Sequence, residues 1–368
     1  MKIFAFHLLN DYSGSPKVLK QLVKGWIENK INVTIVINSG SHGFLSTIPG
    51  ANYRYHSYQW HTNRFLRLII LLMSQVFLIV KYWNIIEKED VIYVNTVLPF
   101  GAGILGKLKG CRVIYHIHET SIKPLFLKKF LFYIVNFTAH DVIYVSRYLS
   151  QTEVIQKPTK HVHYNAIENE FLNTIHHSSH RRAKRENVLM IASLKSYKGI
   201  YEFLELAASC PSYKFRLVVN ANDNTITHFF KSTVIPFNIT MYSTQSNVHP
   251  FYEWADVVLN LSRPDGWVET FGLTILEAMS YHLPAIIPTV GGITELVEEG
   301  INGFHVDCRD NALLKIRLKT ILESDNLYRQ MSEQASIKIK SFTEKEFITQ
   351  SLSLLYTNHC SKIDGPEF

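Results

Sequence analysis

Two carboxylates in the C-terminal half of the chain have the type and spacing to bind a polyhydroxyl ligand. Glu269 and Glu277 stand eight positions apart, with Phe271-Gly272-Leu273 between them. The apolar residues around Glu277 indicate a buried helix face, where a carboxylate is costly unless it meets a ligand or a hydrogen-bonding partner. Gly272 allows a sharp turn and a ligand close to the backbone. The pattern favours sugar or ribose hydroxyls, and its alternative is a buried glutamate that caps a neighbouring loop.

A pair of lysines follows an expected strand earlier in the same half. Lys195 and Lys198 lie in the turn Ser193–Gly199, three positions apart. At this spacing two ammonium groups can point the same way and neutralise a diphosphate without a metal ion. The alternative is a pair of ordinary surface lysines.

Two glycine-containing turns each open an expected helix. In the first, Gly14 precedes Ser15, a predicted N-cap, and a helix predicted over Pro16–Asn29. In the second, Gly291 and Gly292 are adjacent. Backbone N–H groups at a helix start favour a phosphate or a developing oxyanion. Neither turn is a GxGxxG, so a dinucleotide site is disfavoured, and a simple loop is the alternative for each.

A histidine ends a predicted strand of the first half. His118 follows the strand Val113–His116, and in an open α/β sheet ligands bind at the carboxyl ends of strands. A packed or solvated histidine is the alternative in a chain with 17 histidines. His118 and Glu119 are expected to point apart, and no His, Cys and carboxylate set has metal-ligand spacing. No metal site is therefore predicted.

Composition excludes several classes of protein. The chain has 368 residues, of which 46% are hydrophobic and 19% charged, so it is globular and long enough for two domains. Its net charge of +7 suits phosphate-bearing ligands, nucleic acid or an anionic membrane. No zinc-finger, helix-turn-helix or RNA-recognition pattern occurs, so nucleic acid is the least favoured partner.

The cysteines and the N-terminus both indicate a reducing compartment. The four cysteines are scattered and form no CxxC, as expected of reduced thiols. The apolar N-terminal stretch is short and reads as a first strand, not as a signal peptide. We therefore expect a cytoplasmic protein.

Strand-like runs alternate with helical runs along the whole chain. This alternation predicts parallel sheets covered by helices on both faces. The polar, basic stretch 174–186 reads as a linker. It divides an expected N-terminal domain (1–173) from a C-terminal domain (187–342), with a C-terminal helix and tail (343–368) that can pack back on the first domain. The predicted strands are Ile3–Leu9, Asn32–Ile37, Val91–Asn95, Val113–His116, Val142–Val145, Val188–Ser193, Phe215–Asn220, Ile239–Tyr242, Val257–Asn260, Ala285–Ile287 and Gly303–Val306.

Two segments of the first half are unusually apolar. In Phe65–Trp83 the continuous apolar stretch covers 13 residues, against the roughly 20 needed to span a bilayer. Lys123–Phe137 mixes leucine and phenylalanine with lysine. Basic and aromatic residues flank or punctuate both, as in interfacial helices. Buried helices of an α/β domain and peripheral contact with an anionic membrane are both open at this point.

Taken together, these motifs resemble the retaining GT-B glycosyltransferases of the "glycosyl transferases group 1" family, with a family 4-like pattern. Glu269 to Glu277 resembles the family's Glu-x7-Glu signature, including its internal Phe-Gly-Leu. Leu194–Gly199 resembles its lysine-glycine segment, and Phe251–Asp256 matches the approach to the signature. Asn165 stands at the family's Asn-Gly position before the hinge. The resemblance covers nearly the whole chain and implies two Rossmann-like parallel-sheet domains facing a central cleft.

The resemblance also implies roles for individual residues. Glu277 is expected to bind the ribose of a nucleotide sugar, while Glu269 and the N–H groups of Phe271–Leu273 hold the donor sugar. Lys198 is expected to stabilise the diphosphate together with Gly14, and His118 to contact the sugar near the reacting carbon. The implied catalytic residues are His118, Lys198 and Glu269. The implied donor and nucleotide site is Gly14, Ser193, Lys195, Phe271, Gly272, Leu273, Glu277, Gly291 and Gly292.

Three positions depart from the family pattern. Ser193 replaces the usual arginine, so Lys195 is expected to supply the missing charge. The segment 221–224 replaces a glycine-rich turn, and His282 replaces a glycine before the proline. These departures bear on the contacts to diphosphate and base more than on the class of reaction.

The resulting expectation is a retaining, hexosyltransferase-like enzyme that needs no metal or other cofactor. Its donor is expected to be a UDP- or GDP-sugar, and its acceptor a sugar or a lipid-linked hydroxyl in bacterial surface-polysaccharide or glycolipid biosynthesis. It is expected in the cytoplasm or peripherally on the inner face of the plasma membrane. The alternatives are a GT-B epimerase or glucan synthase, or a non-catalytic sugar-binding partner subunit.

Overall fold

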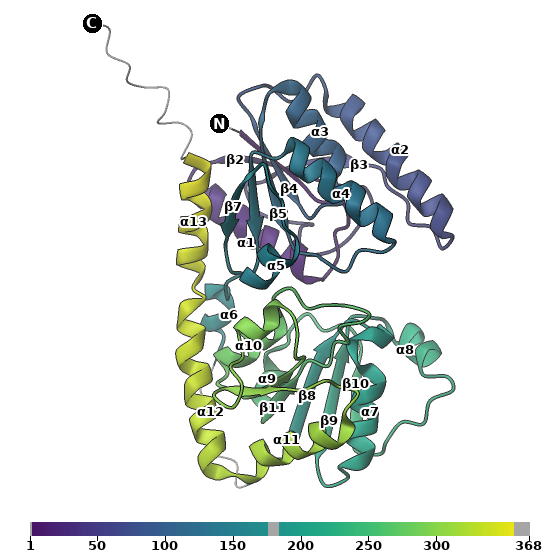
Figure 1. Ribbon diagram of the computed structural model, residues 1–368, viewed down its shortest axis with the longest axis vertical. Helices are drawn as coiled ribbons and strands as arrows, with labels where there is room; N and C mark the ends of the chain where they lie inside the picture. The colour runs from purple at the N-terminus through teal and green to yellow at the C-terminus, as the bar shows by residue number, and fades with distance from the viewer. Residues whose placement is uncertain (1, 176–183, 357–368) are drawn as a thin grey trace, which may run out of the picture. The chain divides into compact units, whose positions relative to one another are not determined.

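The computed structural model describes residues 2–175 and 184–356, and the chain folds into two compact units (Figure 1). The N-terminal unit comprises residues 1–165 and 345–368, and the C-terminal unit residues 166–344. The chain thus enters the second unit before the expected boundary at 173. The short helix α6 (Asn169–Asn173) belongs to the second unit, because Phe171 packs its ring against His249 at 4.2 Å between centroids. Most of the predicted linker 174–186 lies outside the described residues.

The N-terminal unit contains a parallel seven-stranded sheet in the order β3-β2-β1-β4-β5-β6-β7. Its five inner strands were all predicted, and their residues are almost wholly buried. The two edge strands, β3 and β7, were not predicted, because their polar, partly exposed residues give no continuous apolar run. The strands are β1 (Lys2–Phe6), β2 (Asn32–Asn38), β3 (Asn52–His56), β4 (Val91–Asn95), β5 (Arg112–Ile117), β6 (Asp141–Tyr144) and β7 (Thr159–Val162).

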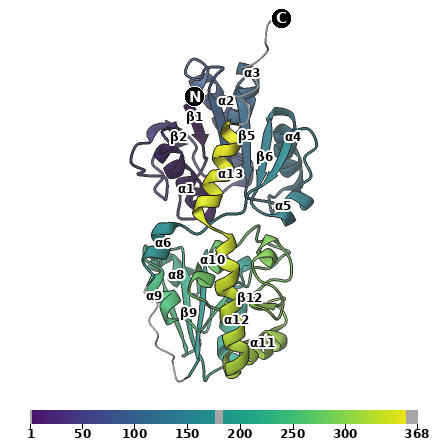
Figure 2. The ribbon, with the colours of Figure 1, turned by 90° about the vertical axis from the view of Figure 1, so that its left-hand side faces the viewer.

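Helices cover this sheet, and the last helix of the chain is one of them (Figure 2). Ser351 on that helix, α13 (Glu344–Tyr356), accepts a hydrogen bond of 2.9 Å from the indole N–H of Trp26 on α1 (Gly14–Glu28). Arg112 donates to the carbonyl oxygen of Leu354 at 2.8 Å, so α13 is tied to both α1 and β5. The helices of the unit are α1 (Gly14–Glu28), α2 (Arg64–Tyr82), α3 (Phe100–Lys109), α4 (Leu125–Thr138), α5 (Arg147–Thr152) and α13 (Glu344–Tyr356).

The start of α1 differs from the prediction. Ser13, not Ser15, stands at the N-cap, and the helix begins at Gly14. Ser13 makes no side-chain cap to the helix, and its hydroxyl donates instead to the carboxylate of Asp11. Pro16 therefore lies inside the first turn. Backbone N–H groups there have no partner within the helix, so the missing N–H of proline costs no hydrogen bond.

The C-terminal unit contains a parallel six-stranded sheet in the order β10-β9-β8-β11-β12-β13. All six strands were predicted. They are β8 (Asn187–Ala192), β9 (Lys214–Val219), β10 (Ile239–Tyr242), β11 (Val257–Leu259), β12 (Ala285–Ile287) and β13 (Gly303–His305). The helices are α7 (Ile200–Ser209), α8 (Asp223–Phe229), α9 (His249–Trp254), α10 (Leu273–Ser280), α11 (Asn311–Glu323) and α12 (Asp325–Lys338), with 3-10 turns η1 (Ser196–Lys198), η2 (Gly292–Glu295) and η3 (Ile339–Ser341).

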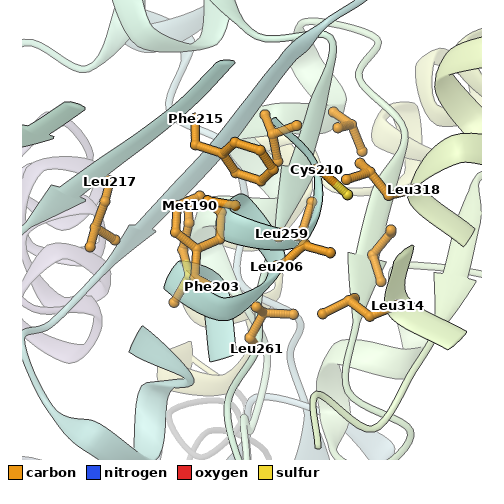
Figure 3. Packing of buried hydrophobic residues seen from close by; sticks show 14 of the residues in the cluster. Met190, Phe203, Leu206, Cys210, Phe215, Leu217, Leu259, Leu261, Leu314 and Leu318 are labelled. Carbon is orange, nitrogen blue, oxygen red and sulfur yellow. The ribbon is translucent and has the colours of Figure 1, made fainter. Parts of the chain in front are cut away.

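The core of the C-terminal unit fills the space between its sheet and the helices α7, α11 and α12. Figure 3 shows Phe203 of α7 beside Phe215 of β9, and their rings meet edge to face at 5.4 Å between centroids. Leu314 and Leu318 of α11 belong to the same cluster. This apolar layer fixes β8, β9 and β11, and so holds the loops at their carboxyl ends.

Each sheet has one point at which the strand order reverses. In the N-terminal unit it lies between β1 and β4, and in the C-terminal unit between β8 and β11. In open α/β sheets ligands bind outside the carboxyl ends of the strands at such a switch point, because the following loops diverge there and leave room. The candidate residues can be judged by whether they lie at these two places.

Candidate functional site

The loops after β8 and β11 approach each other closely at the switch point of the C-terminal unit. After β8 the chain turns through η1 and enters α7 at Gly199, whose φ of +76° is a conformation that side chains disfavour. A Cβ at Gly199 would collide with the carbonyl oxygen of Leu261, in the loop that follows β11. Glycine is therefore required for the contact that brings Lys198 beside that loop.

Lys198 and Glu269 form an ion pair at this switch point, and both side chains are largely buried. The hydroxyl of Ser262 donates to the same carboxylate oxygen at 2.6 Å. The ammonium group also lies 5.0 Å from the ring centroid of Trp267, where a cation–π attraction helps to hold it. Two of the three predicted catalytic residues are thus in direct contact.

The pKa of Glu269 lies below its ordinary value. Burial acts to raise this pKa, but the charge of Lys198 and hydrogen bonds from Lys198, Ser262 and Asn260 outweigh burial. Glu269 is therefore a carboxylate at neutral pH and not a proton donor.

The other two residues of this turn lie apart from the pair. Lys195 is exposed, and within the described residues its side chain has no hydrogen-bond or ion-pair partner. Ser193 is half-buried, and its carbonyl oxygen accepts from the N–H of Lys195 at 2.8 Å. The 3-10 turn η1 thus brings Lys198 to Glu269, while Lys195 stays exposed. A joint contact of both lysines with a diphosphate stays a prediction.

Gly291 joins the second glycine turn to the signature segment. It forms a parallel β-bridge with Glu269, and a Cβ at Gly291 would collide with the carbonyl oxygen of Glu269. Its φ of +122° also disfavours any side chain. Gly292, buried beside it, opens η2. The predicted residues Lys198, Glu269 and Gly291 thus form one contiguous group.

Glu277 lies on the buried face of α10, as predicted. Its carboxylate accepts a hydrogen bond of 2.7 Å from the hydroxyl of Tyr252 on α9. Burial, and then the negative charge of Glu277, raise the pKa of Tyr252 well above its ordinary value, so the phenol remains a donor. Sequence reasoning did not identify Tyr252 as a site residue, although it lies in the segment that approaches the signature.

The turn before α10 is set by Gly272 and Phe271. Gly272 has a φ of +99°, and a Cβ there would lie 2.6 Å from a side-chain carbon of Ile293. Phe271 is buried and meets Phe342 edge to face, at 5.9 Å between ring centroids. Leu273 then begins the helix, so the N–H groups of the first turn point out of its end.

The predicted residues of the N-terminal unit are joined by an asparagine that was not predicted. The side-chain amide of Asn95, at the end of β4, donates 3.0 Å bonds to the carbonyl oxygen of Ser15 and to His7 Nδ1. Its oxygen lies 2.9 Å from His118 Nε2. One buried side chain thus links the turn that contains Gly14, the end of β1 and His118. All three elements meet at the switch point between β1 and β4.

Both histidines of this group are neutral near pH 7. Burial lowers the pKa of His118 to about 3, with a smaller contribution from His7, and burial lowers that of His7 to about 4. Because the oxygen of Asn95 faces His118 Nε2, that nitrogen carries the proton and Nδ1 has the lone pair. His118 therefore offers hydrogen bonds and no positive charge.

Glu119 positions the loops that follow β4 and β5. Its carboxylate accepts 3.1 Å hydrogen bonds from the backbone N–H groups of Val97 and His118. Burial raises the pKa of Glu119 to about 7, despite these bonds. His7, Asn95 and Glu119 were missed as site residues, and the one signal that could have found them is their position at or within two residues of the ends of β1, β4 and β5.

No cluster of three or more His, Cys, Asp or Glu side chains that could hold a metal ion occurs within residues 2–175 and 184–356. Metal independence remains a prediction.

Two family models match successive parts of the chain. The "Glycosyltransferase Family 4" model matches residues 12–168, and the "Glycosyl transferases group 1" model matches residues 173–338. Together they span most of the chain. The protein belongs to the GT-B glycosyltransferases of group 1, with a family 4-like N-terminal half.

Curated relatives of this glycosyltransferase are distant. The N-acetyl-α-D-glucosaminyl L-malate synthase of Bacillus anthracis is 27% identical, over 50% of this chain and 44% of its own length. The α-monoglucosyldiacylglycerol synthase of Acholeplasma laidlawii is 28% identical, over 48% of this chain and 43% of its own length. The chain spans less than half the length of these curated relatives.

Solved structures match the glycosyltransferase along nearly its whole length. The UDP-glucose complex of Anabaena HepE is 18% identical with a TM-score of 0.76, over 97% of this chain and 100% of that one. The sucrose-phosphate synthase of Thermosynechococcus elongatus is 15% identical with a TM-score of 0.77, over 98% and 100%. At these identities the likeness establishes the GT-B fold of two Rossmann-like units.

Proposed function

We propose that this protein transfers a sugar from a nucleoside-diphosphate sugar to an acceptor hydroxyl with retention of anomeric configuration. The observation that carries the proposal is the Lys198–Glu269 pair at the switch point of the C-terminal unit. A cation held in place before the reaction stabilises charge that develops on a departing diphosphate without reorganisation of solvent. Family membership and the signature from Glu269 to Glu277 support the same reaction class.

In this reaction the bond from the anomeric carbon to the diphosphate oxygen breaks, and a bond to the acceptor oxygen forms on the same face of the sugar. The acceptor's proton passes to the departing diphosphate oxygen, the base nearest to a hydroxyl that attacks from that face. Lys198 stabilises the diphosphate and Glu269 holds the donor sugar. His118, as a neutral hydrogen-bonding group, orients sugar hydroxyls and takes up no proton near pH 7.

A ribose site at Glu277 is the part of the proposal most directly tested. Glu277→Ala should weaken donor binding by about 10-fold or more, since a hydrogen bond to a charged group contributes roughly 1.5–3 kcal/mol. Calorimetric titration with UDP-, GDP-, ADP- and dTDP-sugars measures this loss and identifies the base. Tyr252→Phe is the matched variant, because it keeps the ring and removes only the hydroxyl that Glu277 accepts from. Unchanged donor affinity in folded Glu277→Ala would refute the assignment.

We propose UDP-sugars as the first donors to test, because structural neighbours of the same fold are complexes with UDP and UDP-glucose. We also propose that transfer needs no divalent ion, since Lys198 supplies a fixed charge at the site. Activity that EDTA abolishes and magnesium or manganese restores would contradict this second point.

For the acceptor we propose a lipid-linked or membrane-proximal hydroxyl, in bacterial surface-polysaccharide or glycolipid biosynthesis on the cytoplasmic face of the membrane. Two relatives support this proposal. They are the α-monoglucosyldiacylglycerol synthase and the putative glycosyltransferase EpsD of Bacillus subtilis. Analysis of radiolabelled lipid and polysaccharide products with cell extracts as acceptor source tests this proposal.

A further inference from the structure

The helix α2 exposes far more apolar surface than an ordinary surface helix. Its outward side chains are large and apolar: Phe65 is 81% exposed, Phe77 66% and Val80 69%. Its inward side chains are Leu71, Leu78 and Tyr82 together with the polar Ser74 and Gln75, which are 4% and 1% exposed. A surface helix of a water-soluble protein normally buries its apolar stripe and exposes its polar one.

The orientation of α2 is fixed by specific contacts with α3 and β3. The side-chain oxygen of Gln75 accepts from the N–H of Gly101 at 3.0 Å, where α3 begins. A Cβ at Gly101 would lie 2.8 Å from the carbonyl oxygen of Gln75, so the two helix backbones meet closely. Tyr82 donates to the carbonyl oxygen of Tyr55 on β3 at 3.1 Å. Rotating α2 to hide its apolar face would break all of these contacts.

A second apolar stripe lies on α4, in the same helix layer. Phe126, Phe130, Tyr133 and Phe137 recur at spacings of three and four and are all exposed. The helix α3 contacts both α2 and α4 (Figure 1). Because these helices cover one face of the sheet, both stripes belong to the outer surface of one layer, named here the α2–α4 surface.

The charges on this layer have a single sign. The helices α2, α3 and α4 contain no aspartate or glutamate. Arg64 and Lys81 lie near the two ends of α2, Lys107 near the end of α3, and Lys129 on α4 between Phe126 and Tyr133, and all four are exposed. Lys128 is excluded from this set because it pairs with Glu153.

We propose that the α2–α4 surface docks on an anionic lipid bilayer, with α2 and α4 lying in the plane of the interface. Apolar side chains enter the boundary between headgroups and acyl chains, and the basic side chains meet the anionic headgroups. A protein partner would need an apolar groove with matching acidic groups. An anionic bilayer presents both apolar acyl chains and anionic headgroups over any area. The inference rests on the proposed function in one respect: docking brings the protein to the membrane in which a lipid-linked acceptor lies.

The helix α2 docks without crossing the bilayer. It has 19 residues and a mean hydropathy of 1.9, enough by length and composition to span a membrane. However, Gln75 and Tyr82 tie its inner face to α3 and β3, which a spanning helix would have to leave. In-plane docking keeps every one of these bonds.

Flotation of the full-length protein with lipid vesicles tests the proposal. Vesicles of phosphatidylcholine with phosphatidylglycerol should bind the protein, and pure phosphatidylcholine should bind it much less. Each of Arg64→Ala and Lys129→Ala should lower the partition coefficient about 5-fold, the equivalent of about 1 kcal/mol per basic residue at an anionic surface. Phe65→Ser with Phe77→Ser should lower it by about 10-fold or more. Rising salt should release the wild-type protein.

The matched control is Phe237→Ser, because Phe237 is 87% exposed but lies in the C-terminal unit. It should bind vesicles as the wild type does, and an equal loss in this variant would overturn the proposal. A concentration-dependent dimer without vesicle binding, dissociated by Phe65→Ser with Phe77→Ser, would show instead that a second copy covers the surface. Binding that resists salt and alkaline carbonate would indicate a spanning α2.

Donor affinity separates a failure of this inference from a failure of the proposed function. Phe65→Ser with Phe77→Ser should bind UDP-sugars as the wild type does, since α2 carries none of the site residues. Loss of vesicle binding with intact donor binding therefore concerns the surface alone, whereas Glu277→Ala should still float with the vesicles.

Discussion

The two units place their candidate residues at equivalent points of similar sheets. The residues are charged in one unit and neutral in the other. In the C-terminal unit the switch point holds the ion pair of Lys198 and Glu269, and the pKa of Glu269 lies below its ordinary value. In the N-terminal unit the switch point holds Asn95 between two histidines, and burial lowers the pKa of His118 to about 3. One group carries fixed charge and the other is a neutral hydrogen-bonding network.

This difference indicates that the two groups of residues suit different tasks. A diphosphate is a dianionic leaving group and is best stabilised by a fixed cation, whereas a neutral sugar hydroxyl is best held by neutral donors and acceptors. The topology alone explains why each group lies at a strand end. The burial and the partners of each group, and not the fold, decide which of the two tasks it can perform.

The largest effect is expected from removing the fixed cation. Lys198→Ala should lower kcat by about 100-fold or more, the loss seen when one preorganised electrostatic donor is removed. Glu269 would remain as a partly buried carboxylate without its cation, so its pKa should rise. Steady-state kinetics with the preferred donor, on protein whose folding is checked by thermal melting, measure the change.

Lys195→Ala is the matched control, because Lys195 is exposed and lies only three positions away in the same turn. It should leave kcat nearly unchanged. An equal loss in both variants would show that the exposed lysine supplies the charge missing at Ser193, and the ion pair would lose its assigned role.

The same contrast explains how much of the molecule the sequence predicts. The C-terminal group was predicted because Glu269, Gly272 and Glu277 form one short motif, and the central strands β8, β11 and β12 of that sheet are mostly apolar runs. The Lys198 contact depends on the turn of η1, which spacing alone does not specify, and a joint role of the two lysines at a diphosphate stays a prediction.

The N-terminal group was only partly predicted because its members are dispersed. His7, Asn95 and Glu119 lie at or just after the ends of three different strands, and only the strand order brings them together. The edge strands β3 and β7 were missed because an edge strand has no need of a continuous apolar run. Ser15 was wrongly predicted as an N-cap because a serine before a proline also fits inside a first helical turn.

A smaller effect is expected from breaking the neutral network. Asn95→Ala removes the partner of Ser15, His7 and His118, and unsatisfied buried polar groups cost roughly 1–3 kcal/mol. We expect lower stability and slower transfer, and weaker donor binding only to the extent that the proposed contacts of Gly14 and His118 with the donor are lost. Denaturant unfolding, acceptor kinetics and donor titration together measure these three quantities.

Asn302→Ala provides the comparison for this prediction. Asn302 is also buried, in the C-terminal unit, and bonds the backbone at Leu296 and Glu298 at 3.0 and 2.7 Å. Its loss should reduce stability by a similar amount while folded protein keeps its transfer rate. If both variants lose transfer equally, the network around Asn95 has only a structural role.

The smallest effect is expected from a single buried histidine of the N-terminal unit. Burial lowers the pKa of His56, on β3, to about 4, with smaller contributions from Lys81 and His7. Between the unfolded value of about 6.5 and this folded value, the unfolded chain binds more protons. Stability should therefore fall as pH falls through this range, by about 0.7 kcal/mol per such histidine from pH 7 to pH 6. Glu119 acts in the opposite direction, because its folded pKa is raised.

Denaturant unfolding of wild type and His56→Gln at pH 7 and pH 6 isolates the term for His56, since Glu119 contributes equally to both proteins. The variant should lose less stability on acidification than the wild type, whereas His42→Gln, at an exposed site, should match the wild type. Equal acid sensitivity in all three proteins would mean that His56 is accessible to protons in the folded state.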